Sequence, residues 1–507
     1  MIDQALVLDR ADAIARVQSI VIDGDRIVAI GSAIDRDASA VDHVVDGRGK
    51  LVTPGFINAH YHSHDRLDRG RFGPMPLEIW MGLYNPPTVD RGWTADEVYL
   101  RTLMGGIELL RGGATSVIDD VHLGRGLDEA RADAVFRAYR DIGLRADVGI
   151  AFSDKPFQDS VPFLDEILPQ ELKAKPGSGM DPTDMLSLWR GLIEAWSGRV
   201  RAVVSVSGPQ RCTDDFQQRA WTLARDHGRT VLTHVLETRV QALSAEMLYG
   251  RTMVEHLREI GILDRHLILM HGIWTTERDL DLVAAAEARV VHNPGCNLKL
   301  GSGVAPVARM MARGIDVGIG TDNHSGNDGC SMFECVKLAT MLQSLITPDH
   351  RDWLGAADGL QLGIQGGAAC MGKAELGALK VGSVADFLVF DLSDDAFTPL
   401  NDAANHLVFC NPSRALSDVY VNGYRVMADR RLTSIDEDEV RREIAGRIAV
   451  MHGKILAGSA AGTALQPYLA AAFDRCSSDP RLSRLTARCA CWTGLSGGSL
   501  SLRSSPA

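Results

Sequence analysis

The sequence predicts an α/β protein whose central part is a (β/α)8 TIM barrel. Between about residues 56 and 370, short apolar runs alternate with segments of helical period, which predicts parallel strands joined by crossover helices. An open doubly wound sheet is the alternative. The barrel is favoured because the runs end in His, Asp or Asn, and β/α barrels gather their chemistry at the C-terminal ends of the strands. These runs are ATSVIDDVHL, RAVVSVSG, TVLTHVLET, HLILMHGIW, ARVVHNP and IDVGIGTDN.

Two segments of β texture flank this central part. Residues 4–52 alternate apolar and polar residues in short runs, with an Asp-Gly-Asp turn inside SIVIDGDRIVAIG, and this pattern predicts β-hairpins. A similar texture returns at 383–392 and at 417–427, where an Asn-Gly pair predicts a further hairpin. Residues 435–458 then have helical period and an acidic first turn, which predicts one or two outer helices.

Composition limits the classes of partner. The 507 residues carry a formal net charge of −12 and no long run of Lys or Arg, which argues against nucleic acid and favours a small, neutral or cationic substrate. No uninterrupted apolar stretch approaches the ~20 residues of a membrane span, and the N-terminus lacks the pattern of a secretory signal. Nine scattered cysteines indicate reduced thiols. We therefore expect a cytoplasmic enzyme without a membrane partner.

The first candidate metal ligands are His60 and His62. They lie two residues apart after a short apolar run, so in an extended strand both imidazoles project from one face. His64 continues the alternation, and the pair His62 and His64 is the alternative. The earlier pair is preferred because it directly follows the strand, which leaves His64 as a pocket residue or as a hydrogen-bond donor to a ligand.

Two later strands end in histidine. His234 follows an apolar, β-branched run, and Glu237 comes three residues later, which suits a metal ligand beside a proton shuttle. His271 ends a fully apolar strand, where an imidazole could polarise a substrate carbonyl or ring nitrogen, or stabilise an oxyanion. A solvated Glu237 and histidines that are simply satisfied in the core are the structural alternatives.

Asp322 completes the candidate site. It follows an apolar strand and a Gly-Thr turn, so it can serve as a metal ligand and accept a proton from the attacking water. Three imidazoles and one carboxylate leave a position for water on one divalent metal, with zinc expected and iron as the alternative. A second metal would need a bridging group, commonly a carboxylated lysine, and the strand RAVVSVSGPQ contains no lysine.

Together, PGFINAHYH, THVLET, the isolated His271, HNPGCNLKLGSG and GTDN resemble the amidohydrolase superfamily, in the aminohydrolase branch that includes cytosine, guanine and S-adenosylhomocysteine deaminases and the triazine hydrolases. The resemblance implies that His60, His62, His234 and Asp322 are the ligands of one metal. It also implies that Glu237 is the proton shuttle and His271 the polarising imidazole, with Asp322 as a further catalytic group. Members are usually homo-oligomers, so a dimer or tetramer is expected.

The resemblance also assigns the domains. The early and late β segments, including LGALKVGSVADFLVFDL, resemble the composite β-sandwich that flanks the barrel in these enzymes. The Ser-, Arg- and Gly-rich C-terminus has the composition of a poorly ordered tail. The expected boundaries are 1–55 and 373–432 for the β-sandwich, 56–372 for the metal-dependent barrel, 433–475 for C-terminal helices and 476–507 for the tail.

The sequence departs from the family pattern where the substrate would lie. Gly295 and Cys296 stand where many relatives have Ser or Thr, and Asn323 and His324 follow Asp322 where small residues are common. His122 is another polar residue at a strand end. The expected substrate-pocket residues are His64, Trp80, His122, Cys296, Asn323 and His324.

The expected function is hydrolytic deamination of an amino-substituted heterocycle, of purine, pyrimidine or triazine type, by a metal-activated water. The alternative at the same site is hydrolysis of an aryl amide, urea, carbamate or carbon–halogen bond. A hypothesis from another class is a non-catalytic barrel scaffold. It is disfavoured because all six site positions hold chemically competent groups.

Overall fold

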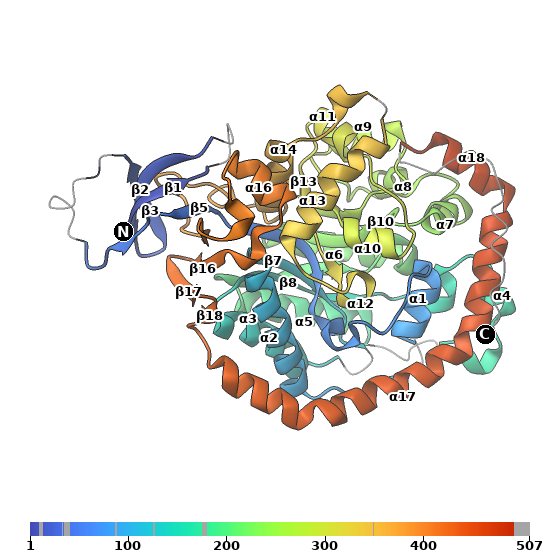
Figure 1. Cartoon of the computed structure of the whole chain (residues 1–507). Coiled ribbons are helices and arrows are strands. Elements are labelled where there is room, and N and C mark those ends of the chain that lie inside the picture. The colour runs from blue at the N-terminus through green and yellow to red at the C-terminus, as the bar shows by residue number, and fades with distance from the viewer. Residues whose placement is uncertain are drawn as a thin grey trace, which may run out of the picture.

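A computed structural model describes residues 1–9, 14–32, 34, 41–86, 89–124, 127–174, 180–347 and 349–490. Its centre is a closed barrel of eight parallel strands (Figure 1), as predicted from the sequence. The barrel closes where Ile319 of the last strand pairs with Asn58 of the first. In order, the strands are β6 (Phe56–His62), β7 (Ala114–Val121), β8 (Arg145–Phe152), β9 (Val200–Val206), β10 (Val231–Val235), β11 (Leu267–His271), β12 (Arg289–His292) and β13 (Val317–Ile319).

The barrel strands are buried on both faces, which explains why their sequences read as continuous apolar runs. All residues of β6, β7 and β11 are buried, because side chains fill the barrel interior and helices cover the outside. The outer helices include α2 (Ala95–Arg111), α3 (Glu129–Ile142), α5 (Pro182–Ala195), α6 (Asp214–Asp226), α7 (Arg239–Tyr249), α9 (Glu277–Ala285), α11 (Val307–Ala312) and α13 (Met332–Leu342).

A separate nine-stranded mixed sheet lies beside the barrel and combines the two ends of the chain (Figure 1). Early β5 pairs with late β15, which confirms that the small domain is composite. Asn422 and Gly423 form the predicted hairpin turn, both at positive φ. The strands are β1 (Ile2–Val7), β2 (Arg16–Asp23), β3 (Arg26–Gly31), β4 (Val45–Asp46), β5 (Lys50–Pro54), β15 (Phe387–Asp391), β16 (Leu416–Val421), β17 (Tyr424–Ala428) and β18 (Arg431–Leu432).

After the small domain, one 42-residue helix, α17 (Glu437–Ser478), runs along the outside of the barrel (Figure 1). Its length and composition would also allow a membrane span, with a mean hydropathy of 1.2 in the relevant window, but these two properties do not separate such a helix from one packed on a protein. Here it packs on α1 (Leu77–Tyr84), α4 (Leu164–Ile167) and α7.

The predicted tail, 476–507, begins inside α17. It continues with α18 (Pro480–Arg488), which packs on α7 through the buried side chain of Leu482. This segment is ordered because its Leu residues face apolar side chains of α7 and α17, a pairing that composition alone does not reveal. Residues 491–507 of the predicted tail lie outside the described residues.

Candidate metal centre

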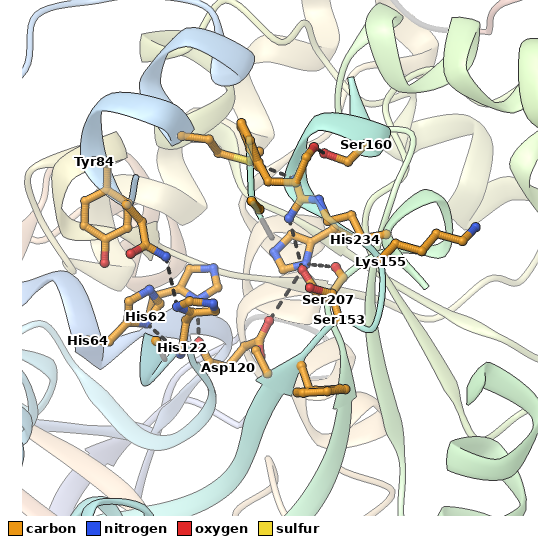
Figure 2. A pocket seen from close by; sticks show the side chains of 18 of the residues that line it. His62, His64, Tyr84, Asp120, His122, Ser153, Lys155, Ser160, Ser207 and His234 are labelled. Atoms are coloured by element: carbon orange, nitrogen blue, oxygen red, sulfur yellow. Dashed lines mark hydrogen bonds and ion pairs between the residues drawn. The ribbon is translucent and has the colours of Figure 1, made fainter. Parts of the chain in front are cut away.

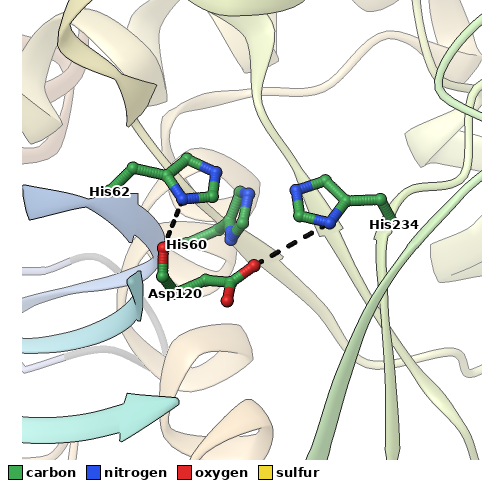
Figure 3. A group of neighbouring side chains, drawn as sticks. All are labelled: His60, His62, Asp120 and His234. Atoms are coloured by element: carbon green, nitrogen blue, oxygen red, sulfur yellow. Dashed lines mark hydrogen bonds and ion pairs between the residues drawn. The ribbon is translucent and has the colours of Figure 1, made fainter. Parts of the chain in front are cut away.

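The two histidines of β6 point into the mouth of the barrel, as their spacing predicts. Their ring centroids are 4.5 Å apart. His60 is completely buried, and neither of its ring nitrogens has a hydrogen-bond partner among the described residues. The Nδ1 atom of His62 lies 2.5 Å from the backbone oxygen of Asp120 (Figure 3), so that oxygen accepts and Nε2 faces the centre of the site.

His234, at the end of β10, approaches from the opposite side (Figure 3). Its Nδ1 donates to the backbone oxygen of Ser207 over 2.7 Å, which leaves Nε2 unprotonated in the neutral ring. The rings of His234 and His60 are 5.0 Å apart. The carboxylate of Asp120 lies 3.8 Å from Nδ1 of His234. Asp120 was not predicted from the sequence, although it also stands near the end of a strand, in VIDDVHL.

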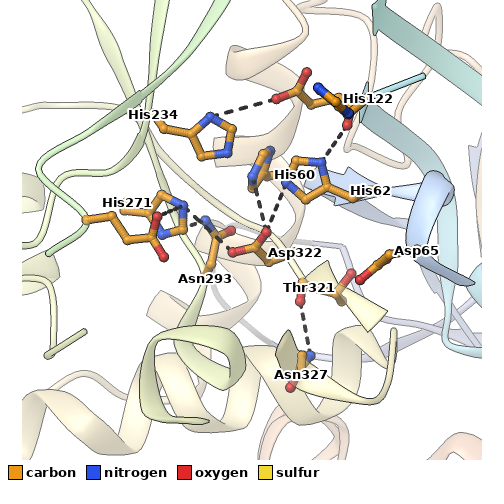
Figure 4. Close-up of polar contacts among 12 residues, drawn as sticks. His60, His62, Asp65, His122, His234, His271, Asn293, Thr321, Asp322 and Asn327 are labelled. Atoms are coloured by element: carbon orange, nitrogen blue, oxygen red, sulfur yellow. Dashed lines mark hydrogen bonds and ion pairs between the residues drawn. The ribbon is translucent and has the colours of Figure 1, made fainter. Parts of the chain in front are cut away.

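Asp322 faces these histidines from β14 (Asp322–Asn323), a short strand that pairs with the end of β6. Its Oδ1 lies 3.4 Å from Nε2 of His60 and 3.1 Å from Nε2 of His62 (Figure 4). Asp322 is buried and has a φ of 62°, and His271 at the end of β11 has a φ of 74°. Such left-handed conformations are costly for residues other than glycine and cluster at functional sites.

Glu237 and His271 complete the group. Oε2 of Glu237 lies 3.4 Å from Nε2 of His271, which is itself 3.7 Å from Oδ2 of Asp322. The backbone N–H of Glu237 donates to Gln241 in α7, which fixes the turn after His234. The structure therefore brings together, near the ends of four strands, the six side chains predicted from the sequence: His60, His62, His234, Glu237, His271 and Asp322.

Burial and charge set the ionisation of the site. Burial, with the Asp322 carboxylate nearby, raises the pKa of Glu237 well above its usual value. Burial lowers the pKa of His234 well below its usual value and that of His271 to about 4, so both rings are neutral near pH 7. Burial also opposes a charge on His62, yet its hydrogen bond to Asp322 raises that pKa to about 10. The negative charge of Asp322, which retains the proton on His62, would equally attract a metal cation.

The donor set fits a divalent metal ion. Ligand atoms of His60, His62, His234 and Asp120 lie within 4.8 Å of one another, and those of His60, His271 and Asp322 form a second such group. Fully buried nitrogen and carboxylate atoms without a hydrogen-bond partner among the described residues are costly unless something else binds them. Imidazole nitrogens and carboxylate oxygens are suitable ligands for zinc or iron.

A layer of hydrogen bonds supports the loop after Asp322. Asp65, in the turn after β6, accepts from the backbone N–H groups of His324 and Ser325, at 3.0 and 2.8 Å. This layer of hydrogen bonds includes His324, which was predicted to line the substrate pocket. His324 does not line the pocket: it is fully buried and its Nε2 lies 2.7 Å from the hydroxyl of Tyr61. Successive residues next to a strand end point in different directions, into the pocket or into the supporting layer of hydrogen bonds. The position of His324 in the sequence did not show which of the two it would face.

A cavity of about 600 Å³ opens above the histidines (Figure 2). Of the residues predicted for the substrate pocket, it is lined by His64, Trp80, His122 and Asn323. Cys296 does not line it. This thiol is 1% exposed and lies beneath the cavity, near the carboxylates of Glu237 and Asp322.

Arg211 also lines the cavity and was not predicted from the sequence. Its guanidinium donates to Ser207 and to the sulfur of Met81, and it has no carboxylate partner within ion-pair distance among the described residues. Burial lowers the pKa of Arg211, though this group stays charged near neutrality. A lone arginine after a Gly-Pro-Gln turn gave no distinctive sequence signal.

The fold and the convergent histidines define a metal-dependent hydrolase of the β/α-barrel class. The chain belongs to the amidohydrolase family, which residues 51–426 match. It is 28% identical over 437 residues to a 5-methylthioadenosine/S-adenosylhomocysteine deaminase of Caldanaerobacter subterraneus subsp. tengcongensis, covering 86% of this chain and 94% of the relative. It is 30% identical over 425 residues to a 5′-deoxyadenosine deaminase of Methanosarcina mazei, covering 84% and 91%.

Solved structures share the fold. An adenosine deaminase from Xanthomonas campestris with bound zinc superposes with a TM-score of 0.79 at 24% identity, covering 89% of this chain and 98% of that one. An atrazine chlorohydrolase from Arthrobacter aurescens TC1 complexed with zinc gives a TM-score of 0.77 at 24% identity, covering 90% and 99%. At this identity the similarity establishes the architecture alone.

Proposed function

We propose that this protein removes an amino group hydrolytically from an amino-substituted heterocycle, with one zinc ion held by His60, His62, His234 and Asp322. The observation that carries the proposal is the convergence of these four side chains around buried nitrogens and a carboxylate oxygen that lack hydrogen-bond partners among the described residues. A bound divalent metal lowers the pKa of a coordinated water toward neutrality and so makes it nucleophilic there.

Glu237 is the proposed proton shuttle. Its carboxyl group is 3% exposed and lies 3.4 Å from Nε2 of His271, inside the cavity that the substrate would enter. Because burial raises its pKa, the group binds a proton readily and can return it to a leaving nitrogen. A carboxylic acid of lower pKa would release the proton more readily but would accept it less readily from the water.

His271 is the proposed group that orients the reacting ring. Its Nε2 faces Glu237 and Asp322 and has no hydrogen-bond partner among the described residues, while Nδ1 is bound to Asn297. A substrate ring nitrogen that gains a proton during attack can hydrogen-bond to this Nε2 atom. The neutral state of His271 is consistent with that role.

The substrate class is proposed from the names of the relatives. Both sequence relatives are named as deaminases of adenosine derivatives, and they match most of this chain. The cavity of about 600 Å³ is large enough for a purine with a substituent, since ligand pockets span roughly 300–1,000 Å³. We also propose that the protein is a homo-oligomer, which light scattering of the purified protein would test, and that it is cytoplasmic, which cell fractionation would test.

The test is ammonia release from a panel of purines, purine nucleosides, pyrimidines and triazines by zinc-loaded protein. We expect ammonia from at least one member, in a one-to-one ratio with the hydroxylated or keto product. Release of halide, amine or carboxylic acid without ammonia would reject deamination in favour of another hydrolysis at this site. Full activity in the Glu237→Gln variant would reject the assigned shuttle.

A further inference from the structure

Three polar side chains form a group on the cavity wall beside the proposed metal centre (Figure 2). His64 lies in the 3₁₀ turn Ser63–Asp68, His122 follows β7, and Asn85 ends α1. The rings of His64 and His122 are 6.0 Å apart. The ring centroids of His64 and His62 are 5.1 Å apart, so this group is a direct neighbour of a proposed metal ligand.

Hydrogen bonds fix which nitrogen of each ring carries the proton. Nδ1 of His64 accepts the backbone N–H of His122 over 3.2 Å, so the proton of the neutral ring is on Nε2. Nδ1 of His122 accepts from Nδ2 of Asn85 over 3.0 Å, which again leaves the proton on Nε2. Neither Nε2 atom, nor Oδ1 of Asn85, has a hydrogen-bond partner among the described residues. The cavity therefore presents two N–H donors and one carbonyl acceptor here.

An aromatic surface lies next to these groups. Trp80 and Tyr84 stack with ring centroids 4.9 Å apart and planes 8° from parallel, and both line the cavity. Tyr84 is 5.9 Å from the ring of His64. A saturated ring or chain could place its carbon atoms against this aromatic surface while its polar groups face the imidazoles.

Two hydrogen-bond donors beside one acceptor are best matched by hydroxyl groups on a ligand. Hydroxyl groups both donate and accept, so they can bind two imidazole N–H groups and the Asn85 oxygen together. A carboxylate only accepts and would face that oxygen unfavourably, and an apolar group would leave all three polar atoms unpaired. We propose that His64, His122 and Asn85 form a subsite for hydroxyl groups on the substituent of the heterocycle, which makes them determinants of specificity.

This inference rests on the proposed deamination, and the experiment separates the two. The ratio of kcat/KM for adenosine to that for 2′,3′-dideoxyadenosine is measured by ammonia release with zinc-loaded protein. We expect the wild-type ratio to be about tenfold or more, since each hydroxyl makes hydrogen bonds that the analogue lacks. His122→Phe should lower the ratio about tenfold, and His122→Gln, which keeps a donor, should retain most of it. His227→Gln changes an exposed histidine that caps the C-terminus of α6; this variant is the matched control and should leave the ratio unchanged.

Binding supplies a readout that needs no reaction. Calorimetry with inosine and 2′,3′-dideoxyinosine should show the same preference and the same loss in His122→Phe. Equal kcat/KM for the two substrates would overturn the subsite and leave the deamination standing. Absence of ammonia from every compound of the panel, with preferred binding of inosine that depends on His122, would overturn the deamination and retain the subsite. Absence of both would overturn both. Metal content and unfolding midpoints of all variants show whether they are folded.

Discussion

The Nδ1 atom of His271 lies 2.9 Å from Oδ1 of Asn297. Nδ2 of Asn293 is a more distant neighbour of the same atom, at 3.3 Å. Because a carbonyl oxygen can only accept, the shorter contact with Asn297 puts the proton of the neutral ring on Nδ1 and turns the Nε2 lone pair toward Glu237 and Asp322. Asn297 is 1% exposed and lies in α10 (Pro294–Lys299). The HNPGCN segment thus sets the tautomer of an imidazole that the preceding strand supplies.

Asn297→Ala should therefore lower kcat about 10- to 100-fold, the usual cost of removing a residue that orients an active-site imidazole. The ring would lose its preferred tautomer and its orientation. Asn297→Asp, which keeps an acceptor for Nδ1–H, should recover part of the loss. Steady-state kinetics and metal analysis check this. A wild-type kcat in Asn297→Ala would show that the contact does not position His271.

Glu237→Gln should lower kcat about 10²- to 10⁴-fold, which is the usual contribution of a general acid–base group. The amide keeps the size of the side chain but cannot carry the proton. Bound metal should stay at the wild-type level, because the proposed ligands are intact. Glu194→Gln, an exposed change on α5, should behave as wild type. Loss of metal together with activity would instead indicate that Glu237 is a ligand.

Removal of the metal should abolish activity and lower the unfolding temperature. A ligand that binds only the folded state stabilises it, by ~2.7 kcal/mol at a free concentration of a hundred times Kd. Chelation followed by dialysis, then titration with zinc, should restore both properties at one ion per chain. Asp322→Ala should fail to regain stoichiometric metal. Recovery that requires two ions per chain would contradict the single-metal centre.

The left-handed backbone at His271 allows a test by stability. Both His271→Ala and His271→Gly remove the ring, but only glycine adopts a φ of 74° without steric cost. We expect the glycine variant to be about 1 kcal/mol more stable than the alanine variant, which reverses the usual order for a strand residue. Urea denaturation of the two variants measures the difference. If the alanine variant were the more stable of the two, the backbone at this position would have relaxed from its positive φ.

The site residues at or close to strand ends could be predicted, whereas the residues that support them from turns and short helices could not. His60, His62, His234, His271 and Asp322 each end an apolar run, and a parallel barrel brings all strand ends to one rim. Asp65 and Arg211 stand in 3₁₀ turns and Asn297 stands in the short helix α10, where side-chain direction depends on the local backbone and on distant partners. His324 and Cys296 follow strand ends too, yet neither lines the cavity: His324 contacts Tyr61, and the buried thiol of Cys296 lies near the carboxylates of Glu237 and Asp322.

A buried ion pair joins the barrel to the small domain. Arg145 of β8 and Asp386, just before β15, form an ion pair of 2.8 Å whose side chains are 5% and 4% exposed. Asp386 also accepts from the backbone N–H of Asn422. Asp386→Ala should destabilise the fold by ~3–5 kcal/mol, because it leaves a guanidinium buried without its charge partner.

Denaturant unfolding of Asp386→Ala measures this loss. Asp226→Ala, which breaks the exposed Arg225–Asp226 pair, is the control and should not shift the midpoint measurably. A double change of Arg145 and Asp386 to apolar residues of similar volume should recover much of the loss, since a buried ion pair gains little over apolar packing. An unshifted midpoint in Asp386→Ala would mean that the small domain contributes no stability to the barrel through this pair.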